Sequence, residues 1–215
     1  MTAPRIGFPG DACVSVEFGQ AIDPAVNARC VSLAAAIERE RLAGVRDIVP
    51  GFHTVMVHFD ALRLDRDTLA AGVQRAILAS AASVDETAAM EIPVRYGGED
   101  GPDLPDVAAF GRCSEAEVIR LHSEAVYRVY MLGFLPGFAY LGAVDGRIAM
   151  PRLDTPRVKV AAGSVGIAGA QTGIYPCDTP GGWRIIGRTP VTTFDPMRAA
   201  PSLFRPGQRV KFVVV

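Results

Sequence analysis

Apolar and polar side chains alternate over residues 13–18, which is the period of a strand with one buried face. A helix is predicted next, because Asp23 is a favourable N-cap, Pro24 suits the first helical position, and apolar residues recur at helical spacing until Gly44. The pattern therefore predicts a strand followed by an amphipathic helix.

Similar patterns continue through the first half of the chain. Strands are predicted at 45–49 and 54–59, a second amphipathic helix at 69–77, and a fourth strand at 92–96. Four strands and two helices in this order are typical of a ferredoxin-like domain, in which both helices cover one face of an antiparallel sheet. We expect this first domain to span residues 1–92.

A second domain is expected over residues 93–215, after a small and polar stretch at 81–90 that is either the approach to the fourth strand or part of a linker. Ser114 and Glu117 form a capping box, which predicts a helix. The following pattern is almost wholly strand and turn, and it ends in an apolar strand at 209–215 that needs cover on both faces. Because closure removes exposed strand edges, we predict an antiparallel β-barrel and an α+β fold overall.

Composition narrows the range of partners. Of the 215 residues, 49% are apolar and 21% are charged, which is typical of a folded globular protein. The net charge of −1 argues against nucleic acid as a partner. Because the sequence has neither an apolar signal segment nor an apolar run long enough to span a membrane, we expect no membrane partner and a cytoplasmic location.

The sequence contains no recognisable metal or phosphate-loop motif. Its four cysteines are scattered, with no histidine at a metal-ligand spacing, so we predict no metal site and interpret the cysteines as buried free thiols. The only two lysines, Lys159 and Lys211, do not follow a glycine as the lysine of a phosphate loop does. Any contact with ATP would therefore need a different architecture.

Half of the 22 glycines, six of the 16 prolines and the only tryptophan lie between residues 130 and 190, together with Arg152, Arg157, Arg184 and Arg188 close to the turns. This turn-rich segment alternates turn signals with short runs of β-forming residues. Glycine lets the backbone turn sharply and approach a ligand, and proline fixes its direction. We therefore interpret the segment as strands joined by shaped loops that carry the function.

Several residues in or near this segment have both a functional and a structural interpretation. His122 lies on the apolar side of its helix, where it could transfer protons in a pocket or be a hydrogen-bonded core histidine. Arg152 and Arg157 each follow a proline that stiffens the backbone, and could either bind a carboxylate or phosphate or make surface salt bridges. Trp183 follows a rigid turn, and its indole could line a groove or fill the barrel. The sequence leaves these alternatives open.

Four motifs occur in order along the chain, namely GFLPGFAYLG, PRLDTPR, AGSVGIAGAQTGIYP and TPGGWRIIGRTP. In this order and spacing they resemble the allophanate hydrolase subunit 1 family, which includes the bacterial 5-oxoprolinase subunit designated B and the inhibitor of the sporulation histidine kinase. The resemblance extends to GDACVSVEFG near the start and to YGGEDGPDL before the second domain. It therefore covers nearly the whole chain.

The resemblance implies a ferredoxin-like N-terminal domain followed by a cyclophilin-like β-barrel. It also implies two partners, a homologous second subunit with another cyclophilin-like barrel and a third, lactam-utilisation subunit. This complex uses ATP to open the lactam of the small molecule 5-oxo-L-proline to glutamate, and the single chain is expected to be inactive alone. Two alternatives stay open: a regulator that inhibits a sensor histidine kinase, and a subunit of an allophanate or urea amidolyase-type enzyme.

Carried onto this sequence, the family motifs imply that His122 is catalytic, and that it transfers protons or orients the substrate. The implied substrate-binding residues are Phe134, Pro136, Gly137, Phe138, Arg152, Arg157, Gln171, Thr172, Tyr175, Gly181, Gly182 and Trp183. In this interpretation the arginines hold anionic groups, and the glycine turns let a ligand approach the backbone.

Overall fold

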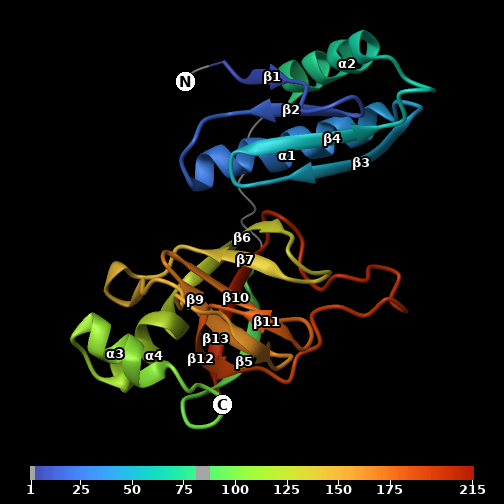
Figure 1. The fold of residues 1–215 in the computed structure, drawn as a ribbon. Coiled ribbons are helices and arrows are strands. Elements are labelled where there is room, and N and C mark those ends of the chain that lie inside the picture. The colour runs from blue at the N-terminus through green and yellow to red at the C-terminus, as the bar shows by residue number, and fades with distance from the viewer. Residues whose placement is uncertain (1–2, 81–87) are drawn as a thin grey trace. The chain divides into compact units, whose positions relative to one another are not determined.

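The computed structural model describes residues 3–80 and 88–215, and the chain divides into two compact units, Met1–Asp85 and Glu86–Val215 (Figure 1). Residues 81–87, which make up most of the stretch interpreted as a strand approach or linker, lie outside the described residues. In the described part of the chain, no helix is both long and apolar enough to cross a membrane.

The first unit is a four-stranded antiparallel sheet with two helices, and its strands lie in the order β1-β2-β4-β3. The elements are β1 (Arg5–Gly7), β2 (Cys13–Glu17), α1 (Pro24–Glu40), β3 (Val45–Pro50), β4 (Thr54–Phe59) and α2 (Arg66–Ala79). Alternate strand residues and the apolar helix faces form one core. Its buried residues include Val14, Val16, Leu33, Ile37, Val55, Val57, Leu69 and Val73.

Local sequence explains where helix α1 begins and ends. The Asp23 carboxylate accepts hydrogen bonds from the backbone N–H groups of Ala25 and Val26, as the predicted N-cap requires. The helix ends at Glu40, before the predicted stop at Gly44, because Arg41 adopts a left-handed conformation with a φ of 47° and caps the helix.

The strand predicted at 92–96 does not join the first sheet, so the predicted strand order is wrong at this point. Strand β5 (Met90–Tyr96) belongs to the second unit, where it pairs with β12 and β13. Strand β1, which is three residues long, occupies the edge of the first sheet beside β2. The alternating pattern of β5 fits any sheet with one buried face, so the pattern alone does not specify its partner.

The second unit is built around a closed seven-stranded barrel in the order β10-β7-β6-β13-β5-β12-β9. Its remaining barrel strands are β6 (Val126–Leu132), β7 (Ala139–Gly142), β9 (Ser164–Ala168), β10 (Gln171–Ile174), β12 (Arg184–Arg188) and β13 (Arg209–Val214). Two further strands, β8 (Arg157–Val160) and β11 (Thr179–Gly181), pair with each other as a two-stranded antiparallel sheet. The helices are α3 (Leu104–Gly111), α4 (Glu115–Glu124) and the short 3₁₀ helix η1 (Gly146–Ile148). Helices α3 and α4 lie together at one side of the barrel (Figure 1).

The barrel is mixed rather than wholly antiparallel, which corrects the predicted architecture. Strand β13 runs parallel to β5 on one side and antiparallel to β6 on the other. Val210 and Phe212 on one face are fully buried, whereas Lys211 and Val213 on the other face are only partly buried, so the terminal strand is not covered on both faces as expected. Only half of the predicted capping box forms: the Ser114 hydroxyl accepts a hydrogen bond from the Glu117 N–H at the start of α4, whereas the Glu117 carboxylate pairs with Arg120 and Arg147.

Candidate functional site

The turn-rich segment folds so that several predicted site residues gather around the buried ring of Phe138. The rings of Phe134, Tyr140, Tyr175 and Trp183 meet it edge-on, with centroid distances of 5.5, 4.9, 5.4 and 5.3 Å. Edge-to-face contact at these distances is the arrangement that aromatic pairs favour. We refer to these five residues as the aromatic cluster.

Phe134 is the exposed member of the aromatic cluster, and its backbone is strained. Its φ is +68°, a left-handed conformation that costs a bulky side chain roughly 1–2 kcal/mol, yet its side chain remains 61% exposed. The same loop contains the exposed Pro136 and the buried Gly137. Backbone strain that holds an apolar ring toward solvent is typical of a binding loop.

The turn at residues 179–183 packs against the aromatic cluster. A Cβ atom at Gly181 would overlap the side chain of Tyr175, so only glycine lets this turn pack on the ring. The carbonyl of Gly182 accepts a hydrogen bond of 2.7 Å from the N–H of Leu153, which ties the loop that carries Arg152 to the same turn. The loops at 133–138, 151–156 and 179–183 thus form one connected surface.

The two predicted arginines have different surroundings. Arg157 Nη2 lies 2.6 Å from Asp103 Oδ1, and the other oxygen of this carboxylate accepts a 2.6 Å hydrogen bond from the N–H of Ile185. The Asp103 side chain is only 5% exposed, so its charge requires these partners. Arg152 is exposed and makes no ion pair with any other described residue. Sequence reasoning missed Asp103, which follows a turn and precedes a helix, as an ordinary helix cap does.

A cavity of about 220 Å³ adjoins the aromatic cluster. Its lining residues are Glu99, Asp100, Pro102, Arg157, Lys159, Val160, Ala161, Ser164, Ile185 and Arg188. Val160 and Ile185 also pack against Phe138 and Tyr175, so the cavity and the aromatic cluster share an apolar wall. Three cationic and two acidic side chains complete the lining, which suits a small polar molecule better than a purely apolar one.

His122 is fully buried, and both of its ring nitrogens have hydrogen-bond partners. Nδ1 lies 2.7 Å from the Tyr96 hydroxyl, and Nε2 lies 2.8 Å from Thr172 Oγ1. The Thr172 hydroxyl donates to the carbonyl of Gly166, so it accepts a hydrogen bond from Nε2–H, and the Tyr96 hydroxyl then donates to Nδ1. Burial lowers the pKa of His122 to about 3, which keeps the ring neutral. This arrangement favours the core alternative for His122.

The two remaining predicted residues, Gln171 and Thr172, are neighbours on strand β10, and Thr172 is a hydrogen-bond partner of His122. The His122 ring stacks on Phe212 at 4.5 Å, inside the barrel. Thr172 is fully buried, whereas Gln171 is partly exposed at the start of β10, paired with Gly142 and Ala168. Neither side chain belongs to the aromatic cluster, so the structure does not unite all the predicted residues in one pocket.

The described residues contain no group of three or more histidine, cysteine or acidic side chains that could hold a metal ion. The cysteines are free thiols, but only Cys13 and Cys30 are buried; Cys113 is partly exposed and Cys177 is exposed. The expectation of buried thiols is therefore wrong for Cys113 and Cys177.

Comparison with known proteins places these features in a family. Residues 4–204 match the family model described as carboxyltransferase domain, subdomain C and D. The chain is 42% identical over 216 residues to the 5-oxoprolinase subunit designated B of Bacillus subtilis, which covers 95% of this chain and 90% of that protein. It is also 42% identical over 216 residues to the corresponding 5-oxoprolinase subunit of Escherichia coli O157:H7, covering 99% and 97%.

A solved structure has the same fold. The crystal structure of TTHA0988 superposes with a TM-score of 0.84 at 39% identity, and the match covers 94% of this chain but only 39% of that longer one. The family match spans both compact units and all the motifs quoted above. The chain therefore belongs to the carboxyltransferase subdomain C and D family, which its motifs indicated under the name allophanate hydrolase subunit 1.

Proposed function

We propose that this chain is a subunit of an ATP-dependent 5-oxoprolinase, which converts 5-oxo-L-proline, ATP and water to L-glutamate, ADP and phosphate. The observation that carries the proposal is 42% identity, over nearly the full length of both chains, to a protein named as a 5-oxoprolinase subunit. The chain acts with a homologous second barrel subunit and a third subunit, and is inactive alone. We place the complex in the cytoplasm.

The chemistry explains why the reaction needs ATP. A lactam carbonyl is a poor electrophile because the ring nitrogen donates electron density to it. Transfer of the ATP γ-phosphoryl group to the lactam oxygen makes the carbonyl carbon open to attack by water. The ring C–N bond then breaks as the nitrogen takes up a proton, and a second water hydrolyses the resulting acyl phosphate to the carboxylate of glutamate and phosphate. ATP is thus a substrate of the whole complex. We assign no residue of this chain to it, because the two lysines are not in a phosphate loop.

The loop surface of the second unit is the part of this chain that we assign to 5-oxoproline. The aromatic cluster offers apolar ring edges to a small five-membered ring and excludes water from one side. Arg157 donates from Nη2 to Asp103 and from Nη1 to the carbonyl of Trp183, and its guanidinium group has further N–H donors for a substrate carboxylate. Arg152 supplies a second, more exposed guanidinium on the adjoining loop.

Because His122 is fully buried, it acts on the loop surface only through the residues that it contacts. Through Thr172 it is linked to β10, whose next residue, Gly173, packs against Phe138 and Trp183. Proton transfer by His122 to a bound substrate remains a prediction.

We further infer that the barrel is cyclophilin-like, and that the first unit is a ferredoxin-like variant whose edge strand comes from the start of the chain.

The proposal is tested by purifying this chain together with its two partner subunits. We expect a heteromer on size exclusion at micromolar concentration, because specific interfaces usually bury more than about 1,200 Å². ADP release by the heteromer should require 5-oxo-L-proline. Separate elution of the subunits, or ADP release that is independent of 5-oxo-L-proline, would contradict the proposal.

A further inference from the structure

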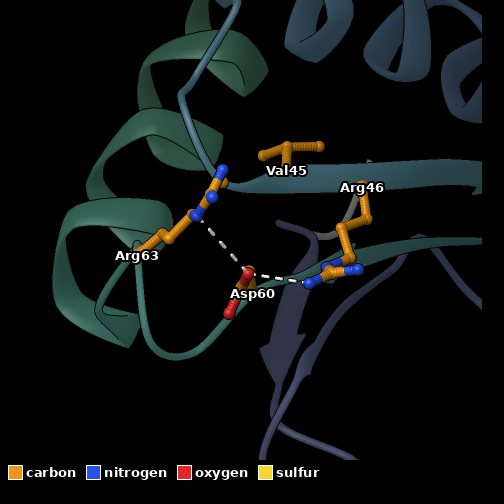
Figure 2. A pocket seen from close by; sticks show the side chains of 5 residues that line it. Val45, Arg46, Asp60 and Arg63 are labelled. Atoms are coloured by element: carbon orange, nitrogen blue, oxygen red, sulfur yellow. Dashed lines mark hydrogen bonds and ion pairs between the residues drawn. The ribbon is translucent and has the colours of Figure 1, made fainter.

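A second cavity, of about 420 Å³, lies in the first unit, which contains none of the residues assigned above to 5-oxoproline (Figure 2). Two short chain segments line it: Gly44 to Arg46 at the start of β3, and Asp60 and Arg63 after β4. Figure 2 shows the Asp60 carboxylate between the guanidinium groups of Arg46 and Arg63. The polar lining therefore comes from three charged side chains.

Asp60 is the fixed element of this lining. One carboxylate oxygen accepts a 2.7 Å hydrogen bond from Arg46 Nη2, and the other accepts a 3.1 Å bond from the N–H of Leu62. The hydrogen bond from Arg46 lowers the pKa of Asp60, so the carboxylate is ionised at neutral pH. Its side chain is 17% exposed, against 68% for Arg46, so the carboxylate anchors the arginine from the protein side.

The backbone is shaped locally to make this arrangement. The register of β3 against β4 shifts between Val45 and Asp47, which leaves Arg46 as the extra residue of a β-bulge. Bulges turn side chains out of the regular alternation and are common beside functional sites. Next to the bulge, Gly44 has a φ of +102°, and a Cβ atom there would lie 2.7 Å from the Cβ of Leu64. A side chain at position 44 would therefore displace the turn that carries Arg63.

The lining has a surplus of hydrogen-bond donors and of positive charge. Two guanidinium groups face one carboxylate, which leaves a net charge of +1. Within the described residues, Arg46 donates only to Asp60, and Arg63 makes only a 3.8 Å ion pair with the same carboxylate. Each guanidinium has five N–H donors in a planar fork that matches a carboxylate or phosphate.

We propose that Arg46 and Arg63 form a binding site for the oxyanion group, carboxylate or phosphate, of a small-molecule ligand, with Asp60 holding Arg46 in position. The two sources of the oxyanion share the same recognition, because both present two oxygens to a guanidinium fork. The site is separate from the 5-oxoproline surface, so its test does not depend on turnover. The competing interpretation is a group of solvated surface charges.

The test is NMR titration of the intact ¹⁵N-labelled chain with sodium phosphate and, separately, with sodium acetate. Sodium chloride at matched ionic strength and pH is the reference. We expect the side-chain Nε–H signals of Arg46 and Arg63 to shift and saturate with at least one of the two anions, and the anion that does so identifies the group. Their assignment follows from the signals lost in Arg46→Gln and Arg63→Gln.

Each of these variants should weaken binding by about fivefold, the loss expected when an exposed charge pair is removed. Arg75→Gln is the matched control, because Arg75 is 59% exposed and pairs only with Glu40 in the same unit; it should bind as the wild type does. Asp60→Asn distinguishes a site that needs Arg46 held in position from simple attraction by positive charge. The change makes the lining more positive but removes the carboxylate that holds Arg46, so it should weaken binding. Shifts no larger than those with chloride, or tighter binding by Asp60→Asn, would overturn the proposal.

Discussion

Replacement of Asp103 by Asn should destabilise the second unit more than any change to an exposed ion pair. The carboxylate is 5% exposed and accepts two 2.6 Å hydrogen bonds, from Arg157 and from the Ile185 N–H. Asparagine has one acceptor oxygen, so one of these donors must face an NH₂ group. Loss of a hydrogen bond to a charged group costs about 1.5–3 kcal/mol, and the Arg157 share is reduced because that side chain is 32% exposed. We expect a loss of about 2–3 kcal/mol.

The assay is urea unfolding monitored by tryptophan fluorescence, because Trp183 is the only tryptophan and lies in the unit that contains Asp103. Glu124→Gln is the control, since Glu124 is 63% exposed and pairs with Arg120 across one helical turn; it should cost less than about 0.5 kcal/mol. A double-mutant cycle with Arg157→Gln should give a coupling energy above about 1 kcal/mol. No coupling, or equal losses for Asp103→Asn and Glu124→Gln, would refute the reasoning.

Three further predictions follow from the second unit. Gly181→Ala should lower its stability by about 1–3 kcal/mol in the same fluorescence assay, because the new methyl group overlaps Tyr175; unchanged stability would contradict this packing. The pKa of His122 is about 3 when folded and about 6.5 when unfolded, so the unfolded state takes up the proton first and stability should fall as the pH drops from about 6.5 toward 3. His122→Gln should lack this contribution in unfolding curves at several pH values, and its turnover per folded complex should stay within a few-fold of wild type; a ~10²–10⁴-fold loss would establish proton transfer. Arg152→Gln should raise the KM for 5-oxo-L-proline about tenfold in the assembled complex without a change in melting temperature, and an unchanged KM would exclude Arg152 from the site.

Elements with strong local signals were predictable from the sequence. The N-caps Asp23 and Ser114 start helices as expected, because a cap depends only on residues within one helical turn. Partner choice between strands was not predictable. Strand β5 pairs in parallel with β13 at the far end of the chain, and its alternating pattern contains no information about that partner or its direction.

The candidate site was predictable only in its residue types. The density of glycine and proline, together with the family motifs, pointed to the loops around Phe138, where Phe134, Tyr175 and Trp183 each contact this ring. The apolar helix face of His122 was compatible with burial, but its partner Thr172 is 50 residues further along the chain, so its hydrogen bonds had no local signal. The same holds for Asp103, whose partner Arg157 is 54 residues away.

The most direct test of the proposed function is the formation of L-glutamate from 5-oxo-L-proline by the three purified subunits with ATP. Glutamate and ADP are measured in the complete mixture and in mixtures that lack one subunit. We expect glutamate and ADP in equal amounts, and none of either without this chain. Full glutamate formation by the other two subunits alone, or no glutamate from the assembled complex, would contradict the assignment of this chain to the 5-oxoprolinase reaction.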